Sequence, residues 1–138
     1  MPAIVDRVVD TLSVVSPSAS PPSRPESPAA GAPRDIDGRP LRLLSIHAHP
    51  DDEASKAAGT VRRYVDEGVG ATLVCCTGGE AGDILNPAMD RPGIAENMPA
   101  IRMVELGRSA EIIGFDRVEL LGYRDSGMEG SAANAHPD

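Results

Sequence analysis

LRLLSIHAHPDDE, residues 41–53, is the stretch of sequence that decides the fold. Its first seven residues form a short apolar run that follows Pro40 and ends before Pro50, which is typical of a buried strand. Residues 47–53 then hold two histidines and three acids. Because ligands bind at the carboxyl ends of the strands in open α/β sheets, this segment is a candidate binding site.

The pattern downstream alternates between helix and strand. Alanine and valine at helical spacing predict a helix over residues 53–67, and a β-branched run predicts a strand over residues 71–77. A Gly- and Pro-rich loop follows, and a second helix is expected to begin near Pro99, since proline is favoured in the first turn. Residues 117–121 read as a third strand. The order β-α-β-α-β predicts an α/β fold with a Rossmann-like parallel sheet and right-handed crossovers.

Composition bounds the size of the folded part and the class of partner. The chain has 138 residues, and 13 basic against 21 acidic side chains give a net charge of −8. This charge, with two Tyr, one Phe and no Trp, argues against nucleic acid or an anionic membrane as partner. Residues 1–40 hold eight of the 13 prolines and are expected to be a disordered tail, which leaves residues 41–138 as the domain. The adjacent Cys75 and Cys76 favour a reducing cytoplasm over a disulfide.

The acids and histidines after the first strand have a metal-binding and a structural interpretation. His49 and Asp52, on either side of a bend stiffened by Pro50, can converge on one ion, with Asp51 beside it as a general base. Alternatively, the acids simply cap the next helix. A magnesium-dependent phosphoryl-transfer site is least favoured, because an imidazole suits zinc better than a hard cation. His47 is expected to be a core or outer-sphere residue.

Three motifs, in order, resemble a known family. HAHPDDE at residues 47–53 is similar to the signature of the LmbE/PIG-L family of zinc-dependent N-deacetylases. TGGEAGDILNPAMD at 77–90 and ELLGYRDSGMEG at 119–130 look like its mycothiol S-conjugate amidase branch, and the latter also like the sister deacetylase of mycothiol biosynthesis. The resemblance implies an LmbE-like fold, one Zn²⁺ per site held by His49 and Asp52, and Asp51 as the general base.

The same resemblance implies substrate-binding roles for three further residues. Glu80 matches an acid that faces the sugar pocket, Arg102 an arginine that grips the inositol portion, and Asp125 a carboxylate that meets sugar hydroxyls. Each has a plainer interpretation. Glu80 could be solvated, Arg102 could pair with Glu105, and Asp125 could form a turn.

The resemblance covers about residues 41–138 and lacks the family's later half. The third zinc ligand of the family is a histidine in that half, so it is expected beyond residue 138. The closing AHPD, with His136, is interpreted as a coincidental match. The chain is therefore expected to be a truncated N-terminal part, weakly active or inactive by itself.

The implied function is an amidase that acts on a small pseudo-disaccharide thiol conjugate. The alternatives are a deacetylase of N-acetylglucosaminyl-inositol or another N-acetyl sugar, and a non-catalytic α/β remnant.

Overall fold

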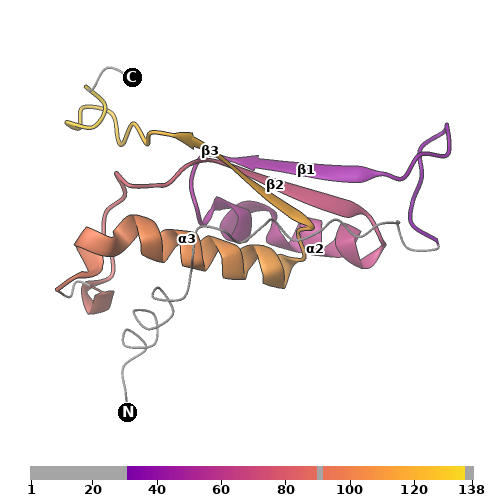
Figure 1. Ribbon diagram of the computed structural model, residues 1–138, viewed down its shortest axis with the longest axis horizontal. Helices are drawn as coiled ribbons and strands as arrows, with labels where there is room; N and C mark the ends of the chain where they lie inside the picture. Colours follow the sequence, from indigo (N-terminus) through magenta and orange to yellow (C-terminus); the bar gives the residue numbers. More distant parts are fainter. Residues whose placement is uncertain (1–30, 90–91, 136–138) are drawn as a thin grey trace, which may run out of the picture.

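The computed structural model describes residues 31–89 and 92–135, which form one parallel sheet with helices on one side (Figure 1). The strands are β1 (Arg42–His47), β2 (Gly70–Thr77) and β3 (Arg117–Tyr123), in the spatial order β1-β2-β3. Both pairings are parallel, with Leu43 opposite Ala71 and Leu73 opposite Val118. The predicted α/β class and β-α-β-α-β order are therefore confirmed.

The first crossover begins with a wider turn than the sequence predicts. A π-helical turn, η1 (Glu53–Ala57), precedes α2 (Ala58–Asp66), so the expected single helix has two geometries. Single π turns inside helices are frequent at functional sites. Here the turn lies directly after the acidic motif, and its first residue, Glu53, is fully buried.

The prediction that the second helix begins near Pro99 is wrong. A short 3₁₀ turn, η2 (Pro87–Met89), interrupts the expected loop, and α3 runs over Ile94–Ile113 with Pro99 inside it. Gly93, at φ 85°, reverses the chain before the helix, and the Asn97 side chain donates to its carbonyl at 2.7 Å. Burial of Ile94 anchors this first turn. Pro99 is the sixth residue of α3 and has no N–H to donate to the Ala95 carbonyl, so the helix lacks one backbone bond there.

The core lies between the sheet and the two helices. A first hydrophobic cluster joins β2 to α3, and its buried members are Leu73, Cys75, Leu106 and Ala110. A second cluster joins β2 to α2 and α3, and its buried members are Val61, Ala71 and Ile113. Phe115 packs against both clusters. Gly114 ends α3 as predicted, at φ 93°, with its N–H bonded to the Ala110 carbonyl. The helices therefore hold a fixed face of β2, and with it the carboxyl end of the sheet.

The opposite face of the sheet carries no helix among the described residues (Figure 1). Leu44 and Ile46 on β1 point there and are 60% and 59% exposed. None of the helices in the described ranges is long and apolar enough to span a lipid bilayer.

Residues 31–40 form a turn that leads into β1. The side chain of Asp35 accepts the backbone N–H groups of Asp37 and Arg39 at 2.9 and 2.8 Å, and Leu41 N–H bonds the Pro33 carbonyl at 2.9 Å. Disorder was predicted for residues 1–40, and residues 1–30 of that range, like His136, fall outside the described residues. The boundary of the tail stays a prediction.

Candidate metal centre

Asp51 occupies a strained turn at the carboxyl end of β1. Its φ is 105°, in the left-handed region that costs a non-glycine residue of order 1–3 kcal/mol. The turn is held from within, because Glu53 Oε2 accepts the Asp51 N–H at 2.9 Å. The Asp51 carbonyl in turn accepts N–H groups from Ala54 and Ser55 at 3.1 and 3.0 Å. The Asp51 side chain is 68% exposed, so its carboxylate is open to solvent, as a proton acceptor requires.

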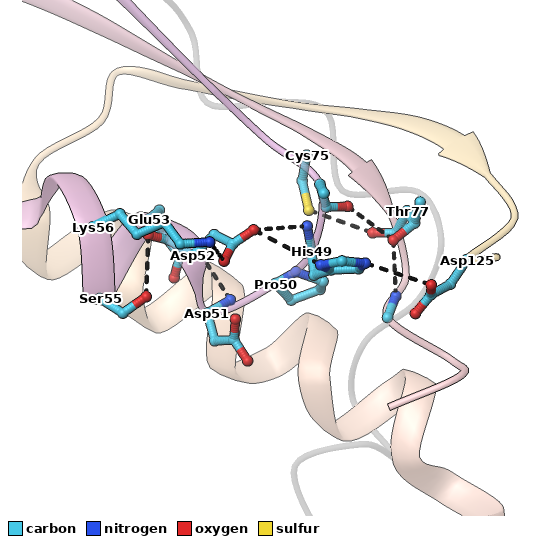
Figure 2. Close-up of polar contacts among 12 residues, drawn as sticks. His49, Pro50, Asp51, Asp52, Glu53, Ser55, Lys56, Cys75, Thr77 and Asp125 are labelled. Carbon is cyan, nitrogen blue, oxygen red and sulfur yellow. Dashed lines mark hydrogen bonds and ion pairs between the residues drawn. The ribbon is translucent and has the colours of Figure 1, made fainter. Parts of the chain in front are cut away.

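His49 and Asp52 face each other across this turn (Figure 2). His49 Nδ1 lies 3.8 Å from Asp52 Oδ2, and the His49 backbone N–H donates to the same oxygen at 3.3 Å. Asp52 occupies the N-cap position of η1, but its side chain makes no capping hydrogen bond. Helix capping therefore does not account for the position of this buried carboxylate.

The other oxygen of Asp52 pairs with Lys56. The Lys56 ammonium contacts Oδ1 from one helical turn further on. Burial by itself would raise the pKa of Asp52, but the Lys56 ammonium and the His49 N–H together hold it below its usual value. The carboxylate is thus kept ionised, with Oδ2 directed at His49.

Asp125, from the segment after β3, lies on the other side of the same imidazole (Figure 2). Its Oδ1 is 3.4 Å from His49 Nε2 and accepts the Gly127 N–H at 2.9 Å, while Oδ2 accepts the Ala81 N–H at 3.3 Å. Burial raises the pKa of Asp125, but the Gly127 N–H, the His49 ring and the Ala81 N–H together hold it below its usual value. The turn-forming interpretation is correct, and the residue also belongs to the site.

Glu80 and Arg102 brace the loops around these groups. Glu80 is exposed, yet its Oε1 accepts the Asp125 N–H at 2.8 Å, which joins the segments after β2 and β3. Arg102 does not pair with Glu105. It donates to Asp51 Oδ2 at 2.8 Å, to the Gly79 carbonyl at 2.5 Å and to the Pro50 carbonyl at 3.2 Å.

All six predicted site residues therefore meet at the carboxyl end of the sheet, although their substrate and catalytic roles stay predictions. Two more residues belong to the arrangement and were missed. Lys56 had a signal, since a lysine four residues after Asp52 is spaced to form an ion pair on one helix face. Glu53 had none, because its bond to the Asp51 N–H depends on the strained turn.

The spacing of the nitrogen and oxygen atoms at this site can be compared with the distances at which zinc binds its ligands. Zinc binds imidazole nitrogen and carboxylate oxygen at about 2.0–2.2 Å, so one ion can touch two donors separated by less than about 4.4 Å. His49 Nδ1 and Asp52 Oδ2, at 3.8 Å, meet this condition. Within residues 31–89 and 92–135, no group of three or more His, Cys, Asp or Glu side chains is arranged to hold an ion. The described residues thus fit as two ligands of a set.

Comparison with known proteins identifies relatives of this architecture. The profile of the family described as PIG-L: GlcNAc-PI de-N-acetylase matches residues 44–138. A mycothiol S-conjugate amidase of Streptomyces coelicolor is 49% identical over 89 residues, 64% of this chain and 30% of that protein. A 1D-myo-inositol 2-acetamido-2-deoxy-alpha-D-glucopyranoside deacetylase of Actinosynnema mirum is 44% identical over 104 residues, 71% of this chain and 37% of that protein.

Solved structures give the same fold. An N,N'-diacetylchitobiose deacetylase of Pyrococcus horikoshii superposes with a TM-score of 0.52 at 31% identity, over 65% of this chain and 32% of that chain. GalB, a 4-carboxy-2-hydroxymuconate hydratase of Pseudomonas putida, gives a TM-score of 0.53 at 26% identity, over 66% and 38%. A hydratase on this fold means that the fold alone does not fix the reaction. The chain spans about a third of the length of the curated relatives it matches.

Proposed function

The chain belongs to the PIG-L family of de-N-acetylases, and from this premise we propose that it is the part of a zinc-dependent amidase that carries the general base and two metal ligands. The substrate we propose is the amide of an N-acylated glucosaminyl-inositol, of the mycothiol S-conjugate type. One observation carries the proposal. Asp51, whose side chain is exposed, lies in the strained turn that separates His49 from Asp52, and these two residues face each other. The two unpaired cysteines agree with a cytoplasmic location, which we also propose.

In this proposal His49 and Asp52 would hold the ion. When bound, zinc supplies Lewis acidity, which polarises the amide carbonyl and lowers the pKa of water. Asp51 takes a proton from the attacking water as the new carbon–oxygen bond forms. The carbon–nitrogen bond then breaks, and the proton returns to the leaving amine, so that the products are a carboxylate and an amine. Arg102 keeps the Asp51 carboxylate in position through the 2.8 Å hydrogen bond.

A second substrate class has specific support. The identity to the acetamido-deoxyglucopyranoside deacetylase, 44% over 71% of the chain, is close to that for the amidase. We therefore keep an N-acetylglucosaminyl-inositol as the alternative substrate. Parallel hydrolysis assays with a mycothiol S-conjugate and with the acetylated glucosaminyl-inositol, quantifying the released amine, decide between them. Preference for the conjugate supports the amidase, and preference for the acetylated sugar overturns it.

Metal content separates the enzyme from a non-catalytic remnant. The purified chain, brought to equilibrium with zinc by dialysis, should retain the metal in elemental analysis, whereas His49→Ala and Asp52→Asn should retain at least ten-fold less. Asp83→Asn is the matched control, because this exposed acid lies in the loop after β2 and should leave zinc retention unchanged. A wild-type chain that retains no zinc, or an Asp52→Asn chain that retains as much as wild type, would overturn the proposal.

A further inference from the structure

Glu53 is a fully buried acid to which the proposed reaction assigns no part. It is the first residue of η1, and only 1% of it is exposed. Burial, together with the nearby Glu53 carboxylate, raises the pKa of the Cys75 thiol, which places Glu53 close to β2. Because a buried carboxylate is costly unless it is hydrogen-bonded, its partner in the fold indicates what it does.

The partner of Glu53 is a backbone group that precedes the helical turn. In a capping box, a glutamate bonds the N–H of the N-cap residue three positions earlier. Glu53 directly follows the N-cap residue, Asp52, and its Oε2 instead accepts the N–H of Asp51 at 2.9 Å. The two nearby cations serve other acids, because Lys56 contacts Asp52 and the Arg102 guanidinium contacts the Asp51 carboxylate. The contact that sets Glu53 apart is therefore its bond to the Asp51 N–H.

Asp51 is the residue of this turn that needs support. Its φ of 105° lies in the left-handed region, which a non-glycine residue keeps only when the surrounding structure holds it there. Two side chains hold it, because Glu53 accepts the Asp51 N–H and Arg102 donates to Asp51 Oδ2 at 2.8 Å. Figure 2 shows the Asp51 carboxylate directed away from Glu53. The backbone of Asp51 is thus held from the core, and its carboxylate from α3.

We propose that Glu53 is a positioning residue, which fixes the left-handed conformation of Asp51 by accepting its N–H. The direction of the Asp51 carboxylate depends on this conformation. The 3.8 Å approach of His49 Nδ1 to Asp52 Oδ2 depends on it as well, because these two residues flank the turn. The inference rests on the proposed function for the roles of these side chains, but the turn is a property of the metal-free chain. The turn requires a hydrogen-bond acceptor at residue 53, and it does not require a charge there.

The first test measures amide hydrogen exchange by NMR on the metal-free chain. Glu53→Gln keeps an acceptor oxygen, whereas Glu53→Met keeps the length of the side chain and offers only a weakly accepting thioether. The Asp51 amide should be protected in wild type and in Glu53→Gln, and it should exchange at least about ten-fold faster in Glu53→Met. The amide of Leu73, which is 0% exposed in the central strand, reports whether each variant is folded. Glu111→Met, at an exposed position of α3, is the matched control.

Two results of this test would overturn the inference. One is an unchanged exchange rate of the Asp51 amide in a folded Glu53→Met chain. The other is an Asp51 amide that exchanges at the unprotected rate in the folded wild-type chain, and this measurement decides the matter if Glu53→Met does not fold.

The second test measures zinc affinity by competition with a chelator for the same four chains. We expect about ten-fold or weaker binding for Glu53→Met, and wild-type affinity for Glu53→Gln and Glu111→Met. Recovery in Glu53→Gln separates positioning from a general need for a buried charge, so equal weakening in both Glu53 variants would overturn the inference. If wild type binds no zinc, the proposed function fails, while the exchange of the Asp51 amide still decides whether Glu53 holds the turn.

Discussion

Arg102 on α3 donates a hydrogen bond from Nη2 to Asp51 Oδ2 at 2.8 Å, although 51 residues separate the two along the chain. The same guanidinium donates to the carbonyls of Gly79 and Pro50, and only 18% of the side chain is exposed. One side chain therefore fastens the strained turn after β1 and the loop after β2 to the helix. This contact makes Arg102 a structural part of the site, whatever it also contributes to substrate binding.

Replacement of Arg102 should be costly in stability. Arg102→Gln would leave the buried Gly79 and Pro50 carbonyls without their charged donor, so we expect about 1–3 kcal/mol lower free energy of unfolding. Urea denaturation followed by circular dichroism measures this difference. Arg108→Gln, at an exposed position of the same helix, should change stability by less than about 0.5 kcal/mol. Equal effects of the two substitutions would contradict the conclusion that Arg102 holds the turn after β1 and the loop after β2 to the helix.

The close approach of Arg102 to Gly79 also predicts how a substitution of this glycine changes stability. A Cβ on Gly79 would lie 2.0 Å from Arg102 Nη1, and the residue has a φ of +66°. Gly79→Ala should therefore destabilise the fold and loosen the Arg102 contacts. Gly107→Ala, in the interior of α3 with nothing within 4 Å of the added Cβ, should instead stabilise it by about 0.5–1 kcal/mol. Thermal unfolding of the two variants checks the opposite signs, and a neutral Gly79→Ala would disprove the steric argument.

Much of this arrangement is predictable because it is local in sequence. Apolar runs mark the strands, and HPDDE at the end of β1 indicates the site, since parallel strands bring their carboxyl ends to one edge. The start of α3 was missed, because the turn at Gly93 and the burial of Ile94 outweigh the preference of Pro99 for a first turn. The partner of Arg102 was also missed. A contact across 51 residues depends on how α3 packs under the sheet, and no spacing rule encodes it.

Acid should weaken the fold through the two site carboxylates whose pKa values are lowered. Asp52 and Asp125 both have a folded pKa below the ordinary 3.8, so the unfolded chain binds their protons first as the pH falls. Their contribution to stability is present above about pH 4 and is lost as the pH drops through the folded values. The urea midpoint should show no loss from these two groups between about pH 6 and pH 4, and it should decrease below about pH 4. The fall should be shallower in Asp125→Asn, and an unchanged pH profile in that variant would contradict the assignment.

Cys75 should resist alkylation as long as the chain is folded. It is 1% exposed, and burial, with the nearby Glu53 carboxylate, raises its pKa to about 11. At about pH 8 only about one thiol in a thousand would be ionised, and the thiolate is the reactive form. Its neighbour Cys76 is only partly buried. With iodoacetamide, mass spectrometry of a Cys76→Ala chain should show slow labelling of Cys75, and a Cys75→Ala chain should label faster at Cys76. In strong urea the two rates should converge, whereas native labelling of Cys75 at the unfolded rate would show that the core around β2 is open.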